Sequence, residues 1–238
     1  MLSPEMTEIL RALHGREETR LGDGCLAALG MDHLVISLSA DAQNSEQIWS
    51  SGGTGSAFED VQFTLGEGPG RDALRTGEPV LEHDLANVGA RWPAFIPATA
   101  HLPIRAAFCL PLALGGITVG VLTALRETPG HMTGQQMDDA HGLATALTLQ
   151  FLDGEGRRLG AWVNALPDGE LHRAVVHQAT GMVSVQLALP LGQALLRLRA
   201  HAYSHDRSII DVAEDVVHRR LRLDDDTPEP ELPNETRG

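Results

Sequence analysis

The stretch Ala106-Ala-Phe-Cys-Leu-Pro-Leu-Ala-Leu-Gly-Gly-Ile-Thr-Val-Gly-Val-Leu-Thr-Ala-Leu125 decides the fold of the larger part of this chain. It contains two apolar runs, 106–114 and 118–125, on either side of the dipeptide Gly115-Gly116. Adjacent glycines readily supply the positive φ angles of a tight hairpin turn. The stretch therefore predicts two strands joined by a hairpin.

The segments around this hairpin predict a sheet flanked by helices. Upstream, 34–40 is typical of a buried strand, 47–51 of a short partner strand, and Gly52-Gly-Thr-Gly55 of the turn that closes that pair. A helix that can break at its glycines is expected over 5–29, and a second over 133–151 with Thr133 as its N-cap. Strands with helices at both ends indicate an α+β domain with an antiparallel sheet.

Composition places the chain among soluble globular proteins. Its 238 residues are 42% hydrophobic but only 4% aromatic, enough for two domains with aliphatic cores. No apolar run is long enough to span a membrane, and acidic residues in the first twenty positions argue against a signal peptide, so we expect a cytoplasmic protein. Cys25 and Cys109 are expected to be buried, reduced thiols.

Charge is distributed unevenly along the chain. The net charge of −14 argues against general binding of nucleic acid, because affinity for phosphates comes from cations. Residues 160–222, however, contain seven Arg and five His against six acidic residues. Any surface that faces RNA is therefore expected in this segment.

Two further changes in composition predict the domain boundaries. Residues 153–169, rich in glycine and charge, are expected to be a linker that can be helical, between a domain over 1–152 and one over 170–222. Residues 223–238 are acidic and rich in proline, which predicts a disordered tail.

The domain over 170–222 is predicted to be three short helices. They cover about 170–187, a segment that begins at Pro190, and a segment that begins at Ser208 as N-cap. Gly181 lies inside the first helix, where glycine is unfavourable, so another backbone or a ligand is expected to approach it.

Residues 63–125 resemble the GAF domains of actinobacterial regulators, and the resemblance extends over roughly 20–152. It rests on Phe63-Thr-Leu-Gly-Glu-Gly-Pro-Gly70, Ala73-Leu-Arg-Thr-Gly77, Asp84-Leu85, Arg91-Trp-Pro93 and Leu110-Pro-Leu112. The family often has Cys at the position of Gly70, so covalent chromophore attachment or thiol redox sensing is not expected there. The resemblance implies a sensor for a small-molecule or protein signal.

Residues 163–222 resemble the ANTAR domain. The resemblance rests on His177-Gln-Ala-Thr-Gly-Met-Val183, Ala194-Leu-Leu-Arg-Leu-Arg199, Ala202 and Asp211-Val-Ala-Glu-Asp-Val-Val217. It implies binding to paired hairpins of a nascent transcript, which prevents a terminator from forming. It also implies that function needs a dimer or two ANTAR modules per RNA, and we expect a homodimer. Thr180 stands where the family commonly has a basic residue.

The candidate RNA-binding residues combine cations with groups on which exposed bases can stack. They are Arg173, His177, Thr180, Gly181, Arg197, Arg199, His201, Tyr203 and Arg207. The alternative interpretation is a solvated helix face that forms ion pairs with Asp206, Asp211 and Glu214. For Arg219, Arg220 and Arg222, complementing the negative end of the third helix is as good an explanation as RNA binding.

Other chemistry finds little support. Gly66-Glu-Gly-Pro-Gly70 lacks the Lys-Ser or Lys-Thr of a phosphate loop and predicts a turn into a helix near Arg71. His83, Asp84 and His101 do not have metal-ligand spacing, and no catalytic motif is recognisable, so we expect no metal, no cofactor and no enzyme.

Two other functions remain open at this stage. The C-terminal helices could serve only dimerisation or phosphotransfer, with His172 or His177 accepting phosphate. They could also be a helix-turn-helix that binds duplex DNA, although the turn 204–207 has no feature that favours it.

Overall fold

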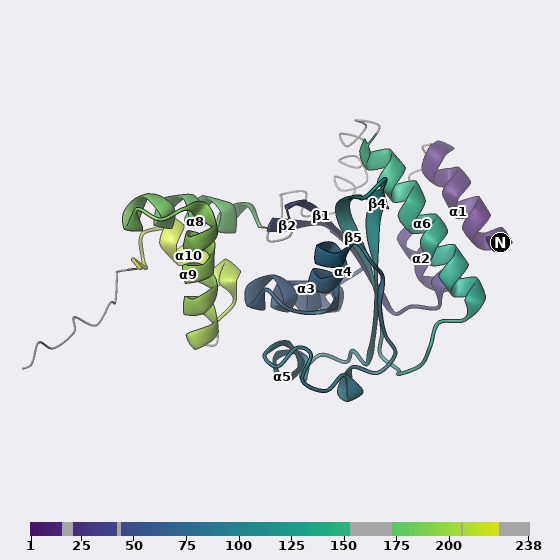
Figure 1. Ribbon diagram of the computed structural model, residues 1–238, viewed down its shortest axis with the longest axis horizontal. Coiled ribbons are helices and arrows are strands. Elements are labelled where there is room, and N and C mark those ends of the chain that lie inside the picture. The colour runs from purple at the N-terminus through teal and green to yellow at the C-terminus, as the bar shows by residue number, and fades with distance from the viewer. Residues whose placement is uncertain (16–20, 42–43, 153–172, 206, 224–238) are drawn as a thin grey trace, which may run out of the picture. The chain divides into compact units, whose positions relative to one another are not determined.

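The predicted hairpin is present and lies inside a five-stranded antiparallel sheet of the computed structural model (Figure 1). It is formed by β4 (Ala106–Leu114) and β5 (Ile117–Arg126), with φ angles of 59° at Gly115 and 83° at Gly116. The sheet has the order β2-β1-β5-β4-β3. Its other strands are β1 (His33–Asp41), β2 (Asn44–Ser50) and β3 (Val80–Glu82).

The structure describes residues 1–15, 21–41, 44–152, 173–205 and 207–223. They divide into two units, Met1–Ala174 and Val175–Gly238. The predicted linker over 153–169 and almost all of the predicted tail lie outside the described residues.

Helices cover both faces of the sheet in the first unit (Figure 1). One face packs against α1 (Pro4–Gly15), α2 (Leu21–Leu29) and α6 (Gly134–Leu152), and the other against α3 (Gly53–Leu65), α4 (Pro69–Thr76) and α5 (Phe95–Thr99). A short 3-10 helix, η1 (Leu85–Asn87), follows β3. The α+β fold predicted from the sequence is confirmed, and the helix expected over 5–29 is present as two.

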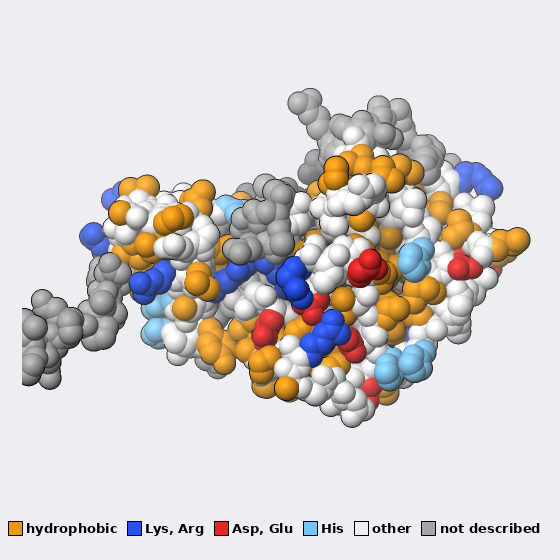
Figure 2. All heavy atoms as spheres, viewed as in Figure 1, with side chains coloured by type: hydrophobic (Ala, Val, Ile, Leu, Met, Phe, Trp, Pro, Cys, Tyr) orange, Lys and Arg blue, Asp and Glu red, His pale blue; other side chains and the backbone are white. Residues whose placement is uncertain are grey.

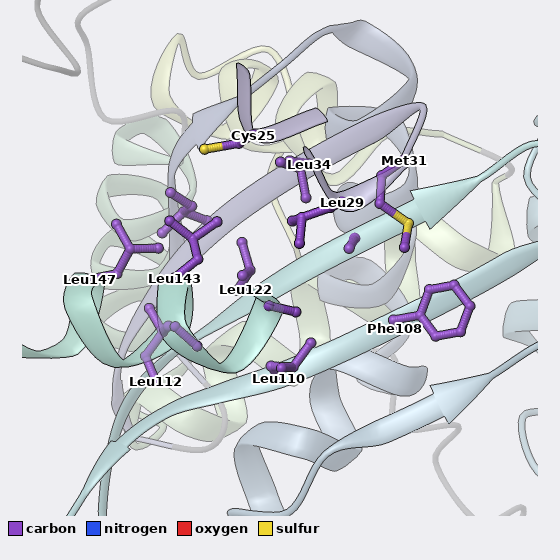
Figure 3. Packing of buried hydrophobic residues seen from close by; sticks show 14 of the residues in the cluster. Cys25, Leu29, Met31, Leu34, Phe108, Leu110, Leu112, Leu122, Leu143 and Leu147 are labelled. Carbon is purple, nitrogen blue, oxygen red and sulfur yellow. The ribbon is translucent and has the colours of Figure 1, made fainter. Parts of the chain in front are cut away.

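The central strands alternate between two hydrophobic cores. On β4, Phe108 and Leu110 point into the core with α1, α2 and α6, whereas Cys109 points into the core with α3, α4 and α5. Figure 3 shows the first core, where Leu110 and Leu122 from the sheet lie near Leu143 from α6. Both strands are therefore buried on two faces, although antiparallel sheets often leave one face to water.

The prediction of a turn at Gly52–Gly55 is wrong. Gly52 is instead the N-cap of α3, and β1 and β2 are joined before Asn44. Gly55 is required by packing, because a Cβ there would lie 2.9 Å from Val35 Cγ2 and 3.0 Å from Ser50 Oγ. Gly55 thus allows α3 to approach the sheet closely, whereas nothing lies within 4 Å of a Cβ at Gly52 or Gly53.

The predicted N-cap of α6 is confirmed. The Gln136 backbone N–H donates to Thr133 Oγ1 at 3.2 Å, and the Thr133 N–H donates to Gln136 Oε1 at 2.9 Å. This reciprocal pair satisfies two amides that the helix leaves without an internal partner.

The second unit consists of three helices, as predicted. They are α8 (Ala174–Leu187), α9 (Leu191–Ser204), whose N-cap is Pro190, and α10 (Ile209–Val217). Ser208 caps α10 by accepting from the Ile210 N–H at 3.1 Å. Among the described helices, none alone is long and apolar enough to cross a membrane, and α8 with α9 meets that test only as a pair bent by 106°.

The double-sided core predicts how much one leucine contributes. Leu110 is 1% exposed, so Leu110→Ala should lower the free energy of unfolding by about 2–5 kcal/mol through lost burial and a cavity. Ile117→Ala in the same hairpin, where the side chain is 65% exposed, should cost less than about 1 kcal/mol. Urea denaturation followed by circular dichroism measures both, and equal losses would contradict the assigned core.

Candidate functional site

A buried carboxylate lies between the sheet and α3 in the first unit. Glu59 is 1% exposed and accepts hydrogen bonds from Ser37 Oγ at 3.2 Å and from Gln62 Nε2 at 2.8 Å. Burial raises the pKa of Glu59 above its ordinary value, and the positive charges of Arg173 and Arg71 partly oppose this rise. A polar centre is therefore built into an otherwise apolar layer.

The polar centre continues into the loop before α4. Gln62 Oε1 accepts from the Gly70 backbone N–H at 2.6 Å, and the loop wraps around the Gln62 side chain. A Cβ at Gly70 would lie 2.9 Å from Gln62 Nε2, so Gln62 fills the space that a side chain at position 70 would need. The expected turn into a helix near Arg71 is confirmed, since α4 begins at Pro69.

Motif residues of the first unit also form a surface cluster around Asp72. Its carboxylate accepts from Arg75 at 2.9 Å, from Arg91 at 3.1 Å and from Trp92 Nε1 at 3.2 Å. Although partial burial opposes ionisation, the bonds from Arg75 and Trp92 lower the pKa of Asp72. The Arg91-Trp92 motif therefore ties the loop before α5 to α4.

Arg173 lies in the first unit and is 0% exposed. Its Nη1 donates to the Ser45 carbonyl at 3.0 Å, and its Nη2 contacts the Glu59 carbonyl at 3.2 Å and Asp60 Oδ1 at 3.1 Å. Its guanidinium carbon lies 4.1 Å from the centre of the Phe63 ring. Arg173, a predicted RNA-binding residue, is therefore not presented to RNA in this structure, because protein groups enclose its charge.

The three helices of the second unit bury one side each. Helical spacing in the sequence predicts Leu191 and Val217 on the buried stripes of α9 and α10, but Leu191 is 62% exposed and Val217 is half-buried; the other predicted members of these two stripes are buried. On α8 the spacing predicts Val175 and Met182, but Val176 is buried in place of Val175, and Met182 is half-buried. The buried residues of the unit's helices are Val176, Ala179, Thr180, Val183, Ala194, Leu195, Leu198, Ala202, Ile209, Val212, Ala213 and Val216.

Thr180 and Gly181, two predicted RNA-binding residues, lie on α8. Thr180 is 7% exposed, and its Oγ1 donates to the Val176 carbonyl at 2.7 Å, so this side chain is not presented to a ligand. A Cβ at Gly181 would meet nothing within 4 Å in the described part of the chain, so no other backbone approaches it there, and the approach of a ligand stays a prediction. His177 is exposed on the same helix.

The predicted residues of α9 lie on two flanks of its buried stripe. Arg197 and His201 are four residues apart and share one flank; Arg199 and Tyr203 have the same spacing and share the other. Tyr203 is 61% exposed, Arg197 is exposed, and Arg199 and His201 are half-buried. Figure 2 shows basic side chains beside exposed hydrophobic ones on this unit.

Aromatic and basic groups continue from α9 into the following turn. The rings of His201 and His205 stack with centroids 4.0 Å apart. Burial and the neighbouring charges of His205 and Arg207 lower the pKa of His201. The His201 ring is thus held more in its neutral form, which favours stacking over charge.

Two arginines at the edge of the predicted basic surface, Arg207 and Arg220, form ion pairs with Asp215. Arg207 Nη2 contacts Asp215 Oδ2 at 2.6 Å, and Arg220 Nε contacts Asp215 Oδ1 at 2.7 Å. These hydrogen bonds lower the pKa of Asp215. The sequence predicted Asp206, Asp211 or Glu214 as partners, of which Asp206 lies outside the described residues, and it missed Asp215 on α10, which pairs with Arg207.

No group of three or more His, Cys, Asp or Glu side chains that could hold a metal ion occurs among the described residues. His83 stacks on His131 with ring centroids 4.1 Å apart, and Asp84 pairs with Arg105 at 3.0 Å. Cys25 and Cys109 are free and buried, as predicted.

Comparison with known proteins identifies both halves of the chain. A family model described as GAF domain matches residues 6–149, and one described as ANTAR domain matches residues 171–217. The search of curated proteins found no match.

Solved structures resemble the first unit. The GAF domain of a phosphoenolpyruvate-protein phosphotransferase from Coxiella burnetii is 15% identical with a TM-score of 0.50, over 66% of this chain and 99% of that one. The corresponding domain from Acinetobacter is 13% identical with a TM-score of 0.48, over 65% and 97%. At this identity the likeness to the Coxiella domain shows the fold.

The close loop around Gln62 predicts a specific cost at Gly68. Its φ of 133° is one that L side chains rarely adopt, and a Cβ would lie 2.6 Å from Gln62 Oε1. Gly68→Ala should therefore lower the free energy of unfolding by roughly 1–3 kcal/mol or more. Gly53→Ala is the matched control, since nothing lies within 4 Å of its Cβ position. Chemical denaturation compares the two, and an equal effect would show that the loop does not close on Gln62.

Proposed function

Because the chain belongs to the GAF domain family and carries an ANTAR domain after its GAF domain, we propose that it is a signal-responsive regulator that binds RNA hairpins and controls transcription termination. Both domains are regulatory, ANTAR domains bind RNA and GAF domains bind small-molecule signals. On this proposal the chain is not an enzyme and acts in the cytoplasm, where transcripts emerge.

The observation that carries the proposal is the surface of α9 within the ANTAR segment. It presents Arg197 and His201 on one flank and Arg199 and Tyr203 on the other. Guanidinium groups neutralise phosphates, and an exposed tyrosine ring offers a face for an unpaired base. Hairpin loops display both partners, whereas the bases inside a duplex are not free to stack on a side chain.

The site we propose is accordingly narrower than the sequence suggested. It comprises His177, Gly181, Arg197, Arg199, His201, Tyr203 and Arg207, without the enclosed Arg173 and Thr180. Arg207 pairs with Asp215 in this structure, so it takes part in RNA binding only by exchanging that carboxylate for a phosphate.

Gating by the GAF domain and action as a homodimer complete the proposal. Paired hairpins offer two sites, which two ANTAR modules occupy together. The GAF domain changes state with its signal and alters how the modules pair, which requires a different affinity of the signal for each state.

Gel shifts with the intact chain test the RNA half of this proposal. A transcript with two hairpins should bind more tightly than duplex DNA of equal length, and binding should weaken with salt. Equal affinity for both nucleic acids would favour a general electrostatic contact and overturn the proposed function.

Arg197→Ala tests the phosphate contact. It should weaken binding and make the slope of log affinity against log salt shallower by about 1. Arg105→Ala in the first unit is the matched control, because Arg105 is an exposed arginine paired with Asp84. An unchanged slope in Arg197→Ala would remove this residue from the interface.

Tyr203→Ala tests base stacking. Loss of one stacked base costs about 1–3 kcal/mol, or about 5- to 150-fold in affinity, and the salt slope should not change because no charge is lost. Tyr203→Phe, which keeps the ring, should bind as the parent chain does. Equal weakening in both variants would assign the effect to the hydroxyl instead.

A further inference from the structure

The ANTAR segment begins with a residue that is buried in the first unit. The ANTAR match starts at residue 171, and α8 starts at Ala174, directly after Arg173. Arg173 belongs to the first unit, where five groups hold it: the carbonyls of Ser45 and Glu59, the carboxylates of Glu46 and Asp60, and the Phe63 ring. The segment is thus fixed at one residue by both backbone and side chain.

The backbone is held as firmly as the side chain. The Arg173 N–H donates to Glu46 Oε1 at 2.7 Å, on β2, while the guanidinium reaches α3. A side chain that only covered apolar surface would leave the backbone free to turn. Here, the first unit holds both the backbone and the side chain of the residue that precedes α8.

Arg173 is also connected to the polar interior of the sensor. The Ser45 carbonyl accepts from Arg173, and the Ser45 hydroxyl accepts from Arg71 Nη1 at 2.9 Å. Glu59 offers its carbonyl to Arg173 and its carboxylate to Gln62. Movement of Glu59 or of the loop that Gln62 holds therefore changes the groups that hold Arg173.

The enclosure is suited to release. The Nε of Arg173 is buried but has no hydrogen-bond partner among the described residues. This makes the docked state of Arg173 less favourable than a fully hydrogen-bonded one. A guanidinium that leaves the site regains its hydration, which offsets part of the interactions that it loses. The free-energy cost of release is therefore smaller than the number of contacts alone suggests.

We infer that Arg173 is a latch: docked on Ser45, Glu59, Asp60 and Phe63, it restrains the ANTAR domain, and its release raises RNA affinity. This inference rests on the proposed function and adds the residue through which the sensor acts. It makes Arg173 a positioning residue and not an RNA contact. The two roles predict opposite effects of removing the Arg173 side chain on RNA affinity. Loss of an RNA contact would weaken RNA binding, whereas loss of the latch would strengthen it.

The first experiment measures restraint without RNA. Spin labels are attached to Thr145→Cys on α6 and Val185→Cys on α8, both exposed positions, in the intact chain. The native thiols stay unlabelled because both are buried; burial raises the pKa of Cys25 to about 12 and also raises the pKa of Cys109. Arg173→Met should broaden the distance distribution, and Arg105→Met should leave it as in the parent. An unchanged distribution in Arg173→Met overturns the latch.

The second experiment measures RNA affinity of the same intact variants. Arg173→Met should bind the two-hairpin transcript at least about five-fold more tightly, within the range of typical coupling between sites. Asp60→Asn, which keeps Arg173 and removes the negative charge that pairs with it, should shift affinity in the same direction by less. Weaker or unchanged binding by Arg173→Met overturns the inference.

Two controls keep the outcomes separate. Thermal unfolding verifies that Arg173→Met and Asp60→Asn remain folded, and Asp60→Asn alone tests the latch if Arg173→Met does not fold. If neither the parent nor any variant binds RNA, the proposed function fails, whereas the spin-label distances still decide whether Arg173 restrains the chain.

Discussion

Burial of both faces of the sheet is the constraint on which the rest of the first unit depends. β4 and β5 alternate their side chains between two cores, so a polar group inside either layer needs a hydrogen-bond partner from the protein in place of water. The same constraint brings backbones close together: a Cβ at Gly120 would lie 2.4 Å from the Ser37 carbonyl oxygen of the neighbouring strand. Close packing and the pairing of buried polar groups are therefore both consequences of covering the sheet on its two faces.

A carboxylate in such a layer needs partners that reach it from outside the core. Arg71 and Arg173 both lower the pKa of Glu59 against the effect of burial, and a long side chain lets each do so from a different segment. Ser45 connects the two arginines through its hydroxyl and its carbonyl. The state of the sensor interior and the position of residue 173 are consequently not independent.

Periodicity predicted most elements from sequence because their burial is one-sided or strictly alternating. The hairpin of β4 and β5, the capped helix α6 and the stripe of α10 are confirmed for this reason. Glycine at Gly52–Gly55 misled the prediction, because close packing and a turn select the same residue. On α8, valine at both 175 and 176 left the buried face ambiguous.

The candidate site was harder to predict, because whether a site residue is buried or exposed can depend on contacts with residues distant in sequence. Arg173 finds Asp60 and Ser45 more than a hundred residues earlier, and no local pattern distinguishes a buried arginine from an exposed one. Arg197 and Tyr203 were predictable because exposure follows from helical spacing within α9 alone. The surface they form is small, and a few cations neutralise only a few phosphates.

The small basic surface of one ANTAR module makes RNA binding depend on how two modules are paired. A single module that neutralises few phosphates binds weakly, whereas two modules on connected hairpins gain from the high effective concentration of the second contact. That gain is lost when geometry prevents both modules from engaging. On the proposed function, restraint at one residue before α8 is therefore sufficient to regulate binding, because it acts on the geometry of the pair and leaves the contacts of each module unchanged.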